Sequence, residues 1–430
     1  MDTAVNIPVD NREDSRTRNT IYIFFFLFYL ASAVTVSQIE PFPAGLDELA
    51  HYSYIRHAAD TRSVFINHDE SFLLNESDLK QWSDTINYLS HPTFYYLALG
   101  MALDITGEAP EHEVARLRIA NIFISSAAIV ILFTLGSSMF KSPISHIVYA
   151  AVVSMLPKIA VIGGIINNDN LAFFGAACTF LGLSWLLKKK VSVGTALLIS
   201  TGFALAALAK LTAGLLVGLV IVFVHAGIYR EFLPFSRKHV GYFAIIFALA
   251  LIGIFPYLFN IFTIGKPIYI NYASYAAFNP EHQLYFDTWE LIGHFFSRLA
   301  VKWAAYEPSN IYQIFSMLFC LVLGLIGLIR TFLDKDVNQN LGIIFKSVFL
   351  TILIMLAIHI YYLHSMYEKT GYYGGATIRY YIPIWPGIAM AAASGTELIN
   401  NERVRSYLVI LLIVLLLSST APFAIIWHHL

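Results

Sequence analysis

Apolar residues gather in long runs that recur along almost the whole chain. Each run holds roughly 17 to 25 residues, and a helix of that length, at about 1.5 Å per residue, crosses the roughly 30 Å of hydrocarbon in a bilayer. The pattern therefore predicts an all-α, polytopic membrane protein with about 11 transmembrane helices. The predicted spans cover residues 21–36, 114–138, 144–163, 168–187, 192–209, 211–229, 240–263, 311–331, 342–363, 381–397 and 405–427.

Basic residues between the runs orient these spans. Lys and Arg cluster in alternate connections, at 188–190, 230–238, 330–335 and 403–405. Because short basic loops stay in the cytoplasm, these connections are expected on the cytoplasmic side. The polar, arginine-containing stretch 1–20 is then a cytoplasmic tail before a retained first helix.

The opposite, outer side is predicted to carry the long connections. These are a first loop at 38–113 and a second at 264–310. The short apolar segment 91–105 is interpreted as a juxtamembrane or re-entrant helix, because counting it as a crossing would move two basic loops to the outside. Residues 398–430 are expected to form a C-terminal transmembrane helix.

Composition narrows the class of protein. Hydrophobic residues make up 57% of the chain, charged residues 13%, and the mean hydropathy is +0.65, which excludes a soluble globular enzyme. The net charge of −1 offers no basic excess for nucleic acid. Cys178 and Cys320 both fall inside apolar runs, so neither a disulfide framework nor a thiolate metal site is expected.

The first long loop begins with adjacent carboxylates. Asp47 and Glu48 follow a Pro/Gly turn, and His51 comes one helical turn after Asp47, on the same face. One interpretation is an ordinary helix start, with a carboxylate capping free backbone amides. The other is a partly desolvated general base that acts on an acceptor hydroxyl.

Further along the same loop, His91 precedes Pro92 and an aromatic pair that includes Tyr95. Pro92 suits the first turn of a helix, and His91 would face the same cavity as Asp47, although the aromatic residues also suit an interfacial belt. His51 and His91 beside Glu48 could alternatively hold a divalent metal, but they lack a repeated ligand spacing. No metal ligands are therefore assigned, and a divalent metal stays open as a cofactor.

Placing Lys or Arg near the bilayer centre costs about 2.5 to 3.5 kcal/mol of free energy. Each such residue in an apolar run therefore needs a structural or functional explanation. Lys158 and one of Arg116 and Arg118 can be explained by snorkelling. Lys210 and Arg379 are better explained as partners of an anion, either a protein carboxylate or a lipid phosphate.

The polar turn around Asn168 and Asp169 lies between two apolar runs. It fits a turn that caps the following helix. Alternatively, Asp169 points into the outer cavity and orients Lys210 or a sugar hydroxyl.

Taken in order, these motifs resemble the GT-C superfamily of integral-membrane glycosyltransferases. The nearest likeness is to the protein O-mannosyltransferase and aminoarabinose (lipid A) transferase branch and to related bacterial membrane families, and it covers about residues 20–390. The motifs are Leu46–Tyr52 (LDELAHY), His91–Tyr96 (HPTFYY), the Asn168-Asp169 turn, Ala209–Thr212 (AKLT) and Gly374–Pro383 (GGATIRYYIP).

The resemblance implies a catalytic domain at 21–397 that transfers a sugar from a polyprenyl-phosphate carrier to a glycan, lipid or protein acceptor, with inversion, at the outer face of a bacterial inner membrane. In such an enzyme Asp47 is the base, with Glu48 beside it. Lys210, Arg379 and Arg116 contact the donor phosphate. His51, His91, Tyr95, Asn168 and Asp169 line the substrate site.

Two other functions fit part of the pattern. Intramembrane charges and interrupted helices also mark secondary transporters or flippases, but these usually show repeat symmetry, which is not apparent here. An outer-face glycan polymerase or ligase would likewise carry arginines in large outer loops. The acidic pair directly after the first helix favours the glycosyltransferase.

Overall fold

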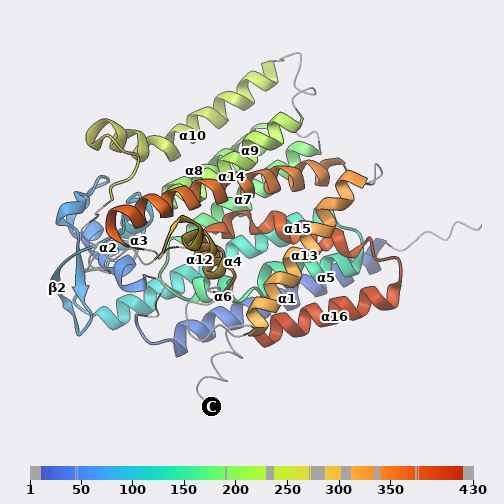
Figure 1. Cartoon of the computed structure of the whole chain (residues 1–430), viewed down its shortest axis with the longest axis horizontal. Coiled ribbons are helices and arrows are strands. Elements are labelled where there is room, and N and C mark those ends of the chain that lie inside the picture. Colours follow the sequence, from blue (N-terminus) through green and yellow to red (C-terminus); the bar gives the residue numbers. More distant parts are fainter. Residues whose placement is uncertain are drawn as a thin grey trace, which may run out of the picture.

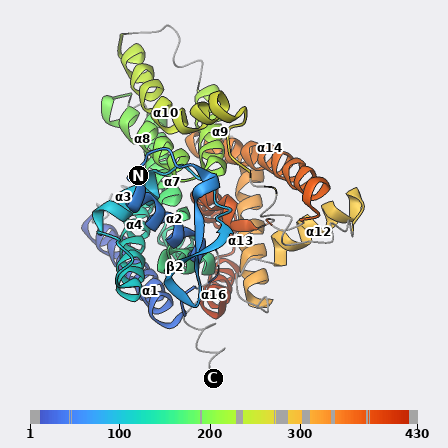
Figure 2. The same ribbon diagram turned by 90° about the vertical axis from the view of Figure 1, so that its left-hand side faces the viewer.

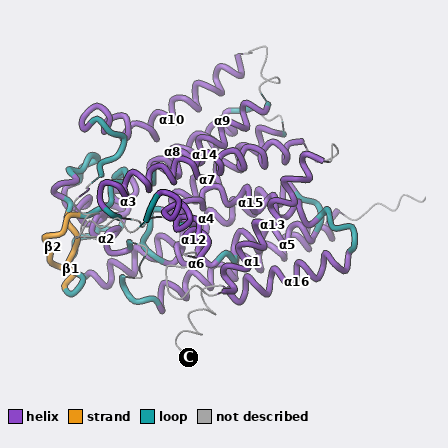
Figure 3. The backbone as a smooth tube through the Cα atoms, viewed as in Figure 1, coloured by secondary structure: helices purple, strands orange, loops and turns teal. Residues whose placement is uncertain are grey.

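The chain folds into a bundle of helices with a small cap at one end. The computed structural model describes residues 11–419 except 44, 46, 189–190, 229–236, 271, 273–285, 302–310, 334–338, 373–374 and 376. Most of the helices run along one direction, and the short elements of the first long loop gather at one end of them (Figure 1, Figure 3). The expected helical membrane fold is thereby confirmed in its coarse form.

Long apolar helices form the body of the bundle. They are α1 (Asn11–Ile39), α4 (Pro110–Met139), α7 (Asp169–Leu187), α10 (Arg237–Ile264), α13 (Ile311–Leu333), α14 (Gln339–Thr370) and α16 (Glu402–Ser419). Shorter helices complete it: α5 (Pro143–Ser154), α6 (Pro157–Gly164), α8 (Val193–Ala209), α9 (Leu211–Gly227), the 3-10 helix η3 (Ile378–Ile384) and α15 (Trp385–Thr396). Helix α12 (Thr288–Val301) lies in the second long loop.

Six of the described helices are long and apolar enough to cross a membrane, or seven if α5 and α6 are one broken span. The expected count of about eleven is not confirmed. Helices α8 and α9 have only 17 residues each, and the apolar run 381–397 is divided between η3 and the short α15. The 17 residues of α8 and of α9 are at the lower limit of a crossing of about 17 to 25 residues, and the 12 residues of α15 fall below it.

The run expected to span at 144–163 is bent by 50° between α5 and α6. Pro157 explains the break, since it has no amide proton to donate and disfavours helical geometry at the residue before it. Lys158 therefore lies in the first turn of a new helix that starts inside the bundle.

Close packing in the bundle depends on small residues. A Cβ added to Gly175 of α7 would lie 2.5 Å from the carbonyl oxygen of Gly202 in α8, and the reverse substitution meets the same contact. Only glycine lets the two backbones approach this closely. This contact holds α7 and α8 together at the point where α7 leads away from the polar Asn168-Asp169 turn.

The first long loop folds into a cap. Its elements are α2 (Glu48–Thr61), the 3-10 turn η1 (His68–Glu70), the antiparallel strands β1 (Phe72–Asn75) and β2 (Asp78–Ile86), and α3 (Phe94–Ala102). The two strands correct the all-α expectation. Helix α3 has 9 residues, about 14 Å, so it is too short to cross the membrane, in agreement with the placement of segment 91–105.

A second apolar core joins this cap to the bundle. It contains buried side chains from α2, β1, α3 and the ends of α4, α7 and α9, among them Tyr52, Ile55, Leu74, Tyr96, Leu117, Ala172 and Val217. Figure 2 looks at this end and shows α2, α3 and β2 in front of the long helices. The loop residues are therefore held rigidly over the helix ends.

Three expectations lie partly outside the described residues. In the predicted tail 1–20, residues 11–20 are the start of α1, and 1–10 are not described. Much of the second loop, 273–285 and 302–310, is likewise not described. In the C-terminal segment 398–430, α16 ends at Ser419 and the remaining residues are not described.

Candidate active site

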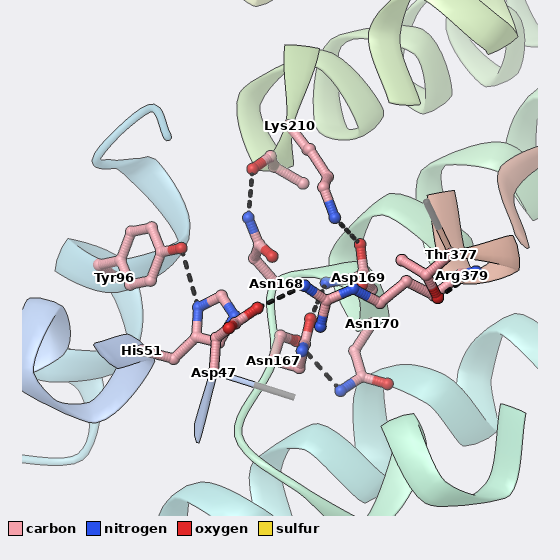
Figure 4. A network of polar contacts seen from close by, with 11 residues as sticks. Asp47, His51, Tyr96, Asn167, Asn168, Asp169, Asn170, Lys210, Thr377 and Arg379 are labelled. Carbon is pink, nitrogen blue, oxygen red and sulfur yellow. Dashed lines mark hydrogen bonds and ion pairs between the residues drawn. The ribbon is translucent and has the colours of Figure 1, made fainter. Parts of the chain in front are cut away.

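Asp47 occupies the N-cap position of α2, but its side chain does not cap the helix. Its backbone has a positive φ of 67°, a left-handed conformation that Asp tolerates better than most residues and that is often found at functional sites. The carboxylate turns away from the helix. Its Oδ1 accepts a hydrogen bond of 2.8 Å from the Tyr88 hydroxyl. Its Oδ2 pairs with the Arg379 guanidinium, as Figure 4 shows. The capping interpretation of Asp47 is therefore wrong.

The surroundings of Asp47 keep it ionised. Burial alone would raise the pKa of the carboxyl group, but the positive charge of Arg379, its hydrogen bond and that of Tyr88 outweigh burial. The net effect lowers the pKa well below its ordinary value of 3.8. At neutral pH Asp47 is therefore ionised, and it is a weak base as long as Arg379 stays paired with it.

Glu48, the next residue, faces the opposite way. It is fully buried and accepts hydrogen bonds from Nε and Nη2 of Arg118, at 2.9 and 2.7 Å, and from the backbone amide of Ile166. Arg118 also donates to the carbonyl oxygens of Ser37 and Glu40. This pairing fastens the start of α2 to α1, α4 and the segment before α7, so Glu48 lies apart from the Asp47 cluster.

The structure also decides between the two arginines of α4. Arg116, expected at the donor phosphate, is exposed, whereas Arg118 is buried. Two positions along a helix correspond to about 200° of rotation, so the two side chains point to opposite faces. Arg116 therefore does not join Lys210 and Arg379.

A second ion pair lies beside the first. Lys210 has an extended backbone that separates α8 from α9, and its Nζ lies 2.6 Å from Oδ1 of Asp169, in the first turn of α7. Both side chains are buried, and the helix N-terminus adds favourable positive potential at the carboxylate. Asn168 is fixed by a 2.6 Å bond from its Nδ2 to the carbonyl of Ala209 (Figure 4).

The polar turn 167–170 caps α7 through Asn167, which fits the expected turn with an N-cap. The side chain of Asn167 accepts a 2.8 Å bond from the amide of Asp169, while Asn168, at the N-cap position, makes no capping bond. The carboxylate of Asp169 is therefore left for Lys210.

Tyr380 links the two ion pairs. The Nζ of Lys210 lies 4.5 Å from the centre of its ring, and the guanidinium carbon of Arg379 lies 5.5 Å from it. Both distances suit cation–π attraction. Neither Tyr380 nor Tyr88 was among the predicted site residues, although Tyr380 directly follows Arg379 in the motif at 374–383.

Two histidines border the cluster. Nδ1 of His51 lies 3.0 Å from the Tyr96 hydroxyl, and the rings of His51 and His91 stack at 6.3 Å. Burial lowers the pKa of His51 to about 3 despite the opposing effect of Asp47, and burial, with Lys210 next, lowers the pKa of His91 well below 6.5. Both imidazoles are neutral at physiological pH.

Tyr95, expected to bind substrate, belongs to another network. Its hydroxyl donates to Oδ1 of Asn121 in α4, which also accepts from Asn170 of α7. This network ties α3 to the bundle. Tyr95 thus positions the cap and does not face Asp47.

The side chains that converge are those of Asp47, His51, His91, Asn168, Asp169, Lys210, Tyr380 and Arg379. Within the described part of the chain, no three His, Cys, Asp or Glu side chains are grouped so that they could hold a metal ion. The cluster instead offers an ionised carboxylate beside fixed cations in a poorly hydrated setting. Such an arrangement suits proton removal coupled to the stabilisation of an anion.

The chain matches no protein-family model, no curated protein and no solved structure. The function is therefore argued from the site.

Proposed function

We propose that this protein is a membrane glycosyltransferase that moves a sugar from a polyprenyl-phosphate carrier to an acceptor hydroxyl. One observation carries the proposal: Asp47 of the first loop pairs with Arg379, and Tyr380 joins this pair to the Lys210–Asp169 pair at one end of a bundle of apolar helices. The same residues carry the resemblance to GT-C enzymes. A lipid-linked donor suits a site that adjoins apolar helices.

The proposed reaction is a single displacement. Asp47 takes the proton of the acceptor hydroxyl as its oxygen attacks the anomeric carbon. The bond between that carbon and the phosphate oxygen breaks, and its electron pair leaves with the polyprenyl phosphate. Attack opposite the leaving group inverts the anomeric centre.

Arg379 and Lys210 have two tasks in this scheme. They stabilise the negative charge that develops on the leaving phosphate. Arg379 also controls the basicity of Asp47, because a guanidinium that turns toward the phosphate no longer depresses the pKa of the carboxyl group as strongly. Donor binding thereby prepares the base.

The proposed location is the outer face of a bacterial inner membrane. The alternation of basic loops supports this orientation, since it places the first long loop outside. The acceptor there is a surface glycan, a lipid or a protein.

The test replaces the proposed base, Asp47, by an asparagine of nearly the same shape. In envelope membranes from a strain that lacks the chromosomal gene, we expect Asp47→Asn to reduce sugar transfer from a labelled polyprenyl-phosphate donor by about 10²- to 10⁴-fold, the usual contribution of a general base. Asp60→Asn, at an exposed position near the other end of α2, is the matched control and should transfer at the wild-type rate.

Two results would overturn the proposal. One is unchanged turnover in Asp47→Asn. The other is a wild-type protein that moves the labelled lipid or its headgroup across the membrane without cleaving the sugar–phosphate bond, which would favour a transporter.

A further inference from the structure

Lys158 is a buried basic residue that belongs to neither of the two ion pairs of the site. Its side chain in the first turn of α6 is 2% exposed, and the charges of Arg379, Asp169 and Asp47 all act on it. In the described part of the chain, its Nζ forms no ion pair and no hydrogen bond. Snorkelling therefore does not explain Lys158, because the side chain ends inside the protein.

The charges around it do not balance. Asp47 pairs with Arg379 and Asp169 pairs with Lys210. A protonated Lys158 adds one positive charge without a carboxylate of its own. A buried amine without a partner readily loses its proton, and an anion bound beside it would hold it in the charged form.

Two acceptors of the polar turn before α7 also lack partners. Oδ2 of Asp169 and Oδ1 of Asn168 are buried and receive no hydrogen bond from the described residues. Their other polar atoms are already used by Lys210 and by the carbonyl of Ala209, which fixes their orientation. The site thus needs a ligand that combines an anionic acceptor with hydrogen-bond donors.

We propose that Lys158 binds the phosphate of a glycosyl phosphate and that Asp169 and Asn168 accept hydrogen bonds from hydroxyls of its sugar. The inference rests on the proposed function for the nature of the ligand. Phosphate alone would satisfy Lys158 but neither acceptor, and a neutral sugar would satisfy only the acceptors. A compact ammonium with three donors suits a phosphate oxygen.

The first experiment measures binding to the purified full-length protein in detergent. The probes are a short-chain polyprenyl phosphate, its hexosyl and pentosyl derivatives, inorganic phosphate and the uncharged polyprenol. We expect Lys158→Met to weaken binding of the polyprenyl phosphates at least tenfold and Lys158→Arg to stay within about threefold of the wild type. Lys141→Met, an exposed lysine just before α5, should bind as the wild type does.

A second readout separates ligand binding from a structural role. Without ligand, Lys158→Met should unfold at a higher temperature than the wild type, because it removes a buried polar group without a partner. A variant that unfolds earlier than the wild type and binds as tightly would overturn the assignment. Wild-type affinity in Lys158→Met would do so by itself.

A separate binding measurement tests the proposed contacts to the sugar. Asn168→Ala should weaken binding of a glycosylated lipid and leave the affinity for polyprenyl phosphate unchanged. Equal Lys158-dependent affinity for inorganic phosphate and for every glycosylated lipid would overturn the sugar part.

The inference and the proposed function fail differently. Lys158-dependent binding without any cleavage of the donor supports the inference and removes the glycosyltransferase. Cleavage with the same KM for the donor in wild type and Lys158→Met removes the inference and keeps the enzyme.

Discussion

Two buried ion pairs lie where the cap meets the bundle and differ in how completely they are satisfied. In the Glu48–Arg118 pair, the N–H groups of Arg118 reach the carboxylate and three backbone carbonyls, and Glu48 also accepts from a backbone amide. In the Asp169–Lys210 pair, Oδ2 of Asp169 has no partner among the described residues. A complete network holds elements together, whereas an incomplete one is suited to bind something else.

At this end of the molecule, one set of charged residues holds the fold together and a neighbouring set forms the candidate site. Glu48 and Arg118 join the cap to the bundle, and their neighbours leave no hydrogen-bonding capacity for a substrate. Asp47 and Asp169 are instead paired with cations, and these cations could exchange a carboxylate for a phosphate. Substitutions in the two regions should therefore change different properties.

The largest expected effect comes from breaking the complete pair. Arg118→Met leaves the Glu48 carboxylate buried without its partner, and such losses cost about 3 to 5 kcal/mol of unfolding free energy. Chemical unfolding in detergent micelles measures this change. The double variant Glu48→Leu with Arg118→Met should recover part of the loss, because no isolated charge remains.

A loss below about 1 kcal/mol in Arg118→Met would contradict the structural role of this pair.

The second largest expected effect is a pH dependence of stability that is caused by His51. Its pKa is 6.5 in an unfolded chain and about 3 in the fold, so the unfolded state binds more protons between these values. Stability is therefore greatest above pH 6.5 and falls as the pH falls toward 3. His51→Phe should remove about 2 kcal/mol of the loss between neutral pH and pH 5.

Asp47 does not interfere in that window. Its pKa lies near 3.8 when unfolded and well below that in the fold, because Arg379 offsets the effect of burial, so its contribution to stability is lost only in stronger acid. Thermal unfolding at pH 7.5 and pH 5 measures the difference between His51→Phe and wild type. Equal pH sensitivity of the two proteins would show that His51 protonates in the fold.

The sequence predicted the coarse fold and the main charges of the site for physical reasons. Long apolar runs leave a chain no stable alternative to helices in lipid. Charged residues beside or within such runs need partners of opposite charge, and Asp47 and Asp169 supply these partners for Arg379 and Lys210. These expectations depend on residue type and position alone.

The remaining features depend on geometry that residue type does not encode. The positive φ of Asp47 turns its side chain away from that of Glu48, and helical phase decides that Arg118, not Arg116, is buried. The bend at Pro157 places Lys158 inside the protein, where a straight span would have let it reach the surface. Each feature follows from a local backbone direction.

The smallest expected effect concerns the ring that joins the incomplete pairs. Tyr380→Leu removes the aromatic face in contact with Lys210 and Arg379 and, at about 1 to 2 kcal/mol for desolvated cation–π contacts, should raise the KM for the lipid donor about 5- to 30-fold. Tyr380→Phe keeps the ring and should match the wild type. Equal KM values for Leu and Phe would mean that the two cations are held by their carboxylates alone. In that case Asp47 and Asp169 would form two independent pairs, and donor binding at one would leave the other unchanged.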